Sequence, residues 1–136
     1  MKKIIMLAGL IFVILYGSNT KAQQSCESKI KDTKWYYKSD SIDDVYLIFR
    51  GNGRFESAEE DANIYYGYYK CSGDTVITID ESSKYDKKKF RKSVVISILK
   101  DNQLIPIYSK WDNLKARTKF DKSCIMYKDT TYKVRK

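Results

Sequence analysis

Two clusters of carboxylates are the first residues of this chain that could do chemistry. They lie within residues 40–44 and 56–61. Paired carboxylates can exchange protons with a substrate or bind calcium. Neither cluster has the spacing of an EF-hand loop, and neither has the apolar surroundings that would perturb a pKa. We therefore predict that both clusters are solvated loop charge.

Histidine is absent from the chain, and this narrows the possible chemistry further. Histidine is a common ligand of zinc, copper and haem iron, and it is the usual base beside a catalytic cysteine. The sequence also has no phosphate-cradling glycine loop and no nucleophile elbow. We predict no catalytic residue, no metal site, no cofactor and no enzymatic activity.

The N-terminal segment has the composition of an export signal. Lys2 and Lys3 precede an apolar run over 4–16, and Thr20 and Ala22 form a small-x-small cleavage site. The apolar run is shorter than the ~20 residues that a membrane-spanning helix needs. It also lacks the cysteine of a lipobox. We predict cleavage after residue 22 and a single domain over 23–136, either periplasmic or secreted.

An oxidising compartment favours disulfides, and three cysteines lie in the predicted mature chain. Cys26, Cys71 and Cys124 can form one bond and leave one thiol, in any of three pairings. Cys71 would share a strand face with Tyr69 and could be a buried apolar thiol. On this ground we favour a disulfide between Cys26 and Cys124.

Tyrosine is abundant, with 12 in the chain, and four lie close together in one predicted strand. Alternation places Tyr65 and Tyr69 on one face and Tyr66 and Tyr68 on the other. One pair could fill a core while the other forms an exposed aromatic ladder. Alternatively, Tyr66 and Tyr68 are outward anchors for a protein partner.

Residues 81–92 are the most polar stretch. Their basic side chains could contact an anionic partner such as lipid headgroups, lipopolysaccharide or an acidic protein; those we expect to do so are Lys87, Lys88, Lys89 and Arg91. The alternative is a solubilising hairpin tip that protects a strand edge. We expect no nucleic-acid partner, because the chain has no recognisable nucleic-acid module and an exported protein rarely meets one.

Short apolar and aromatic runs separated by polar turns predict β-strands. Residues 51–53 and 72–74 contain glycines suited to tight turns. Pro106 cannot donate a ladder hydrogen bond, so its strand should be short, bulged or at an edge. The eight predicted strands span 34–38, 45–49, 54–58, 64–71, 75–80, 93–99, 104–108 and 122–127.

Sequential strands joined by tight turns predict an all-β fold: an eight-stranded antiparallel up-and-down meander closing into a small barrel. We expect at most one short helix, near residues 110–119, with Trp111 and Leu114 turned inward. After cleavage the mature protein should not span a membrane.

Three groups of residues carry a family resemblance: Asp32-Thr33-Lys34-Trp35, then Leu47-Ile48-Phe49 with Gly53-Arg54-Phe55, then Gly67-Tyr68-Tyr69 with Gly73-Asp74-Thr75. Together they resemble the small exported lipocalin-like (calycin-type) domains of bacteria. The resemblance implies a barrel that binds something apolar, with Trp35 at its floor and Lys128 over the tryptophan. The chain has Thr33 where that family usually has the glycine of Gly-x-Trp.

Two functions follow as hypotheses. The first is a non-enzymatic lipocalin-like binding protein that holds a small apolar or amphipathic ligand. Its expected ligand or core lining is Trp35, Phe49, Phe55, Tyr65 and Tyr69. The second is an envelope protein-interaction module, such as an inhibitor or immunity protein, that acts through its outer surface. An open apolar cavity favours the first hypothesis, whereas a barrel filled by Trp35, Phe49, Phe55, Tyr69 and Ile96 favours the second.

Overall fold

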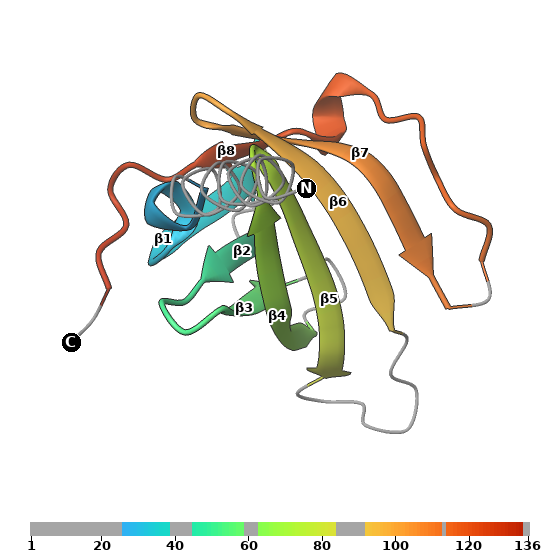
Figure 1. Ribbon diagram of the computed structural model, residues 1–136, viewed down its shortest axis with the longest axis horizontal. Coiled ribbons are helices and arrows are strands. Elements are labelled where there is room, and N and C mark those ends of the chain that lie inside the picture. Colours follow the sequence, from blue (N-terminus) through green and yellow to red (C-terminus); the bar gives the residue numbers. More distant parts are fainter. Residues whose placement is uncertain (1–25, 39–44, 59–62, 84–91, 113, 135–136) are drawn as a thin grey trace, which may run out of the picture.

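Eight antiparallel strands follow one another in sequence and close into a barrel (Figure 1). The computed structural model describes residues 26–38, 45–58, 63–83, 92–112 and 114–134. Each strand pairs with the next, and the last returns to pair with the first. The strands are β1 (Thr33–Tyr37), β2 (Tyr46–Phe49), β3 (Arg54–Ala58), β4 (Ile64–Ser72), β5 (Thr75–Ser83), β6 (Ser93–Lys100), β7 (Gln103–Trp111) and β8 (Met126–Lys128).

The expected meander and its closure are confirmed. The expected helix is displaced: β7 ends at Trp111, and the 3₁₀ helix η1 (Lys122–Cys124) follows later in the chain. Leu114 is exposed rather than turned inward. A second helical segment, which the strand pattern did not reveal, spans 26–30. None of the helices in the described ranges has the length and apolar character needed to cross a membrane.

Turn residues and the single proline act as expected. Gly53 in the β2–β3 turn and Gly73 in the β4–β5 turn both have positive φ, at 75° and 59°, which glycine adopts without strain. Pro106 lies in β7 opposite Ser97, beside a register shift that leaves Ile107 as an extra residue. The bulge interrupts the ladder where Pro106 has no N–H to donate.

Alternating strand direction gives the barrel two different ends. We call the end where β1 begins the base; it carries the β2–β3, β4–β5 and β6–β7 turns and the helical residues 26–30. We call the other end the rim; it is where β1, β3, β5 and β7 finish. The segments 39–44, 59–62 and 84–91, which follow β1, β3 and β5 in the sequence, lie outside the described residues.

The base is filled by a packed core. Ile30, Trp35 and Phe49 have no exposed surface, and all belong to one cluster of buried apolar residues. The Trp35 indole Nε1 donates to the Thr33 hydroxyl at 2.7 Å, and that hydroxyl donates to the Ile30 carbonyl oxygen. Thr33 therefore gives the buried indole N–H the partner that it needs.

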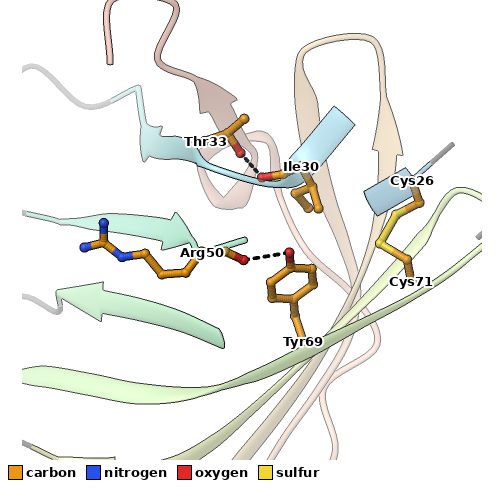
Figure 2. The surroundings of a disulfide bond; sticks show 6 residues. All are labelled: Cys26, Ile30, Thr33, Arg50, Tyr69 and Cys71. Carbon is orange, nitrogen blue, oxygen red and sulfur yellow. Dashed lines mark hydrogen bonds between the residues drawn. A yellow bond between two sulfur atoms is a disulfide. The ribbon is translucent and has the colours of Figure 1, made fainter. Parts of the chain in front are cut away.

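A disulfide ties the helical residues 26–30 to the barrel (Figure 2). Cys26 bonds to Cys71 near the end of β4, with Cα atoms 5.8 Å apart, and Cys124 is a free thiol. The expected Cys26–Cys124 pairing is therefore wrong. The reason is topological: residue 26 precedes β1 and residue 71 ends β4, both at the base, whereas residue 124 precedes β8 at the rim.

Gly67 is the point where β4 approaches β5 most closely. A Cβ at this position would lie 2.0 Å from the Ile79 carbonyl oxygen and 2.6 Å from Cε1 of Phe55. We expect Gly67→Ala to lower the free energy of unfolding by about 2 kcal/mol, because backbone and ring must both shift. Urea unfolding measures this loss.

Gly51→Ala is the matched control for that substitution. The three atoms nearest to its Cβ would all belong to side chains: Cε of Lys31 at 2.8 Å and the Asp32 carboxylate oxygens at 3.3 and 3.4 Å. We expect a change within about 0.5 kcal/mol, as for ordinary surface substitutions. Equal effects of the two alanines would contradict the close approach at Gly67.

Candidate functional site

A cavity of about 140 Å³ lies inside the barrel on the rim side of the core. Its walls come from every strand except β4, with Trp111 from β7 and Cys124 from η1. The apolar part of the wall includes Leu47, Phe49, Phe55, Val76, Val95, Leu104 and Met126. The barrel is thus filled at its base and hollow towards its rim.

A polar strip runs up one side of this cavity. It is formed by Thr78 and Asp80 of β5 and by Ser93 and Ser97 of the adjacent strand β6. Ser57 of β3 adds a separate hydroxyl to the wall. Alternation explains its composition, because Thr78 and Asp80 point the same way as Val76 along β5. The cavity wall is therefore amphipathic, with a largely apolar surface and a few fixed polar groups, as in many small-molecule sites.

Asp80 is the charged group of the strip. Its side chain is 7% exposed and accepts a hydrogen bond from the Ser93 hydroxyl, which is itself buried. Burial raises the pKa of the Asp80 carboxyl to about 6, and the Ser93 hydrogen bond opposes that rise. Among the described residues, no charged neighbour contributes to the shift. The carboxylate therefore titrates close to neutral pH.

The backbone of β5 turns Asp80 inward beside a bulge. Gly67 pairs with Asp80 while Tyr66 pairs with Ser82, so Glu81 is an extra residue in the ladder. A bulge re-aims the side chains next to it. Glu81 forms an ion pair with Arg54 at 2.6 Å, and both side chains are more than 40% exposed. Asp80 is thus buried at the cavity, whereas the adjacent Glu81 is exposed and ion-paired.

Four of the five residues expected to line the barrel lie in the core or at the cavity, and the fifth, Tyr65, belongs to neither. Phe49 and Phe55 belong to the buried cluster and also line the cavity. Trp35 and Tyr69 lie in the core beneath it. The Tyr69 ring meets Phe49 edge-on at 4.9 Å, and its hydroxyl donates to the Arg50 carbonyl at 2.9 Å (Figure 2). Tyr65 is partly buried, at an inward position opposite Ser57.

Ile96 does not plug the barrel. It pairs with Ile77 and Tyr108, whereas the neighbouring Val95 is the residue that lines the cavity. Alternation therefore places Ile96 on the outer surface. An inward Ile96 would require β6 to be shifted by one residue. Such a shift moves every side chain of the strand to the opposite face.

The expected surface residues are only partly described. Tyr66 and Tyr68 lie on the outer face of β4 and are half-buried, and Lys70 lies over the Tyr68 ring at 5.9 Å. Lys87, Lys88, Lys89 and Arg91 lie outside the described residues. Their contact with an anionic partner stays a prediction.

Glu56 belongs to the carboxylate cluster at 56–61, which we predicted to be solvated loop charge, and for Glu56 this prediction is wrong. It lies in β3, accepts a hydrogen bond from the Tyr46 hydroxyl at 2.8 Å and pairs with Arg50 at 3.2 Å. Arg50 also donates to the Tyr132 hydroxyl. Burial and Glu56 together raise the pKa of Tyr46 to about 12. This outer cluster attaches the C-terminal segment to the barrel.

Within the described ranges, no group of three or more histidine, cysteine, aspartate or glutamate side chains could hold a metal ion. The residues that sequence reasoning missed are Asp80 and Ser93. The strand pattern gave no signal for them, because in both β5 and β6 the face that carries Asp80 or Ser93 is the less apolar of the two. Comparison with protein-family models, curated proteins and solved structures finds no match to this chain.

Proposed function

We propose that this chain is an exported, non-enzymatic, lipocalin-like protein that holds a small apolar or amphipathic ligand in its barrel. The observation that carries the proposal is the rim-side cavity of about 140 Å³ above a filled base. An engineered apolar cavity of about 150 Å³ takes up benzene. A molecule with one ring or a short chain therefore matches this cavity in size.

The proposed family membership has support at the base of the barrel. Trp35 is fully buried in β1, and Lys128 of β8 is its partner in the ladder. These are the positions that the lipocalin resemblance implies for the floor tryptophan and its basic neighbour. Thr33, which replaces the family's glycine, is accommodated because its hydroxyl bonds the indole.

Native mass spectrometry of protein purified from its own envelope tests the binding role directly. A copurifying small molecule that dissociates on activation is the expected result. Titration with benzyl alcohol, followed by calorimetry, gives a test with a defined probe. We expect a Kd of about 1 mM or tighter, which is within reach for so few ligand atoms.

Filling the cavity should abolish this binding. We expect Val95→Phe to weaken benzyl alcohol binding at least tenfold, because its ring would occupy the space that Val95 now lines. Val94→Phe is the matched control, since Val94 is adjacent in β6 and points outward opposite Ile79. Equal binding by both variants and the parent protein would place the ligand outside the cavity.

A second candidate function is interaction with another envelope protein through the outer surface. The outward positions of three neighbouring strands carry half-buried aliphatic side chains: Ile77, Ile79, Val94, Ile96, Ile98 and Ile105. Apolar surface of this kind marks many interaction sites. This candidate is favoured if Val94→Lys abolishes the protein's activity in its host while Val95→Phe leaves it intact.

A further inference from the structure

The wall of the cavity contains one carboxylate and, among the described residues, no basic side chain. Asp80 is the lining residue that carries a formal charge, and its neighbours on the wall are hydroxyl or apolar groups. The other lining residues with titratable side chains are Tyr37, Cys124 and Tyr46, and the Tyr46 hydroxyl is bonded to Glu56 in the outer cluster. A negative charge at pH 7 is thus set into a neutral surface.

Burying an ionised carboxylate is costly unless a counter-charge accompanies it. Ser93 supplies a single hydrogen bond, and a carboxylate can accept several more. The two ion pairs of the described residues, Arg50–Glu56 and Arg54–Glu81, belong to other carboxylates. With respect to the part of the chain that the structure describes, Asp80 therefore retains both acceptor capacity and uncompensated charge towards the cavity.

We propose that Asp80 is the anchor for a protonated amine, so that the ligand of this barrel is a small amphipathic amine. This inference rests on the proposed ligand-binding function and specifies its ligand class. The ammonium group donates hydrogen bonds to the free acceptor sites of Asp80, and the apolar body packs against Phe49 and Phe55. A charge-assisted contact is stronger than a neutral one, and the cavity wall reduces its screening by water.

The size of the cavity limits the amine. About 140 Å³ is below the ~300 Å³ at which drug-sized sites begin. A single aromatic ring with one short aminoalkyl arm meets this limit. Benzylamine is therefore a suitable probe, and benzyl alcohol is a near-isosteric neutral control.

Calorimetric titration at pH 7.5 compares the two probes. We expect benzylamine to bind at least tenfold more tightly than benzyl alcohol. Asp80→Asn should remove this preference and leave benzyl alcohol binding within about threefold. Asp74→Asn is the matched control: it removes an exposed carboxylate from the β4–β5 turn at the base and should preserve the preference.

A pH series on the unmodified protein provides a second readout that needs no variant. Benzylamine stays protonated from pH 7.5 to pH 5, whereas Asp80 becomes neutral as the pH falls through about 6. Affinity for benzylamine should therefore fall over this range, while affinity for benzyl alcohol stays level. The other titratable side chains close to Asp80 lie on β4 and β5. Tyr65 and Tyr69 of β4 are at inward positions, but they are phenols and not carboxyls. Glu81 of β5 is an acid, but it points outward and is paired with Arg54.

The outcomes separate the inference from the proposed function. Equal binding of amine and alcohol would overturn the amine anchor and leave the binding role intact. An amine preference that persists in Asp80→Asn would also overturn it. Failure of both probes to bind the unmodified protein would overturn the proposed function and the anchor with it.

Discussion

Reduction of the Cys26–Cys71 disulfide is expected to lower the free energy of unfolding by about 4 kcal/mol. The two cysteines are 45 residues apart in sequence. Closing a loop of that length in the unfolded chain removes conformational entropy worth roughly this amount. The bond also holds the helical residues 26–30 at the base, where Ile30 is fully buried. Loss of the bond releases the element that closes the core.

Guanidinium unfolding with and without a reducing agent measures the effect, with tryptophan fluorescence as the signal. The double variant Cys26→Ala with Cys71→Ala should match the reduced protein in stability. Cys124→Ala is the control, because this thiol is unpaired. Its unfolding should shift by less than about 1 kcal/mol.

Peptide mapping without reduction identifies the bond itself. A cross-linked peptide pair containing residues 26 and 71 is expected. Recovery of a crosslink to residue 124, or coincident unfolding of the oxidised and reduced protein, would contradict this account of the base.

Replacement of Asp80 by asparagine is expected to stabilise the empty barrel by about 1–3 kcal/mol at pH 7.5. The folded protein holds this carboxyl at a pKa of about 6, above its ordinary value of 3.8. Between these two values the folded state binds more protons than the unfolded state, so stability falls as the pH rises. A shift of about two pKa units corresponds to roughly 3 kcal/mol.

The pH window follows from that sign. The free-energy cost of holding the ionised Asp80 carboxylate in the folded protein is absent below about pH 4, grows from pH 4 to pH 6, and is complete above pH 6. The asparagine variant should therefore match the parent protein near pH 4 and exceed it at pH 7.5. Its amide oxygen can still accept from Ser93, whereas its NH₂ group needs a new partner, which reduces the gain.

Chemical unfolding of the two proteins at pH 4, 5, 6 and 7.5 tests this difference. Asp74→Asn controls for the loss of one negative charge from the whole molecule. An asparagine variant less stable than the parent protein at pH 7.5 would show that Asp80 has a counter-charge. In that case the amine anchor would lose its physical basis.

The order of the strands and most of their positions were predictable from the sequence because they rest on local patterns. The eighth strand is the exception: it was predicted over 122–127, but Lys122–Cys124 form η1 and β8 spans only Met126–Lys128. Alternation of apolar and polar side chains defines each strand, and glycines that tolerate positive φ define the turns at Gly53 and Gly73. The register error at Ile96 arose in a strand rich in Val and Ile on both faces. There the period-2 signal is weak, and pairing with the neighbouring strands decides which face points inward.

The strand order of the predicted topology argues against the Cys26–Cys124 pairing, although residue spacing did not reveal this. In an up-and-down barrel, strand parity determines which end a residue occupies. Cys71 lies near the end of the fourth strand at the base, as Cys26 does before the first, whereas Cys124 precedes the start of the eighth.

The sequence by itself determined an eight-stranded meander, its turns, and the aromatic residues that fill its base. Strand periodicity and turn geometry are local properties, so residues that are close in sequence determine them. Only the tertiary structure decided that a cavity remains above Phe49 and Phe55, that Cys26 meets Cys71, and that Asp80 faces inward with no described cation beside it. Cavities, cross-links and missing counter-charges depend on which side chains meet across the barrel, and those side chains are far apart in the chain.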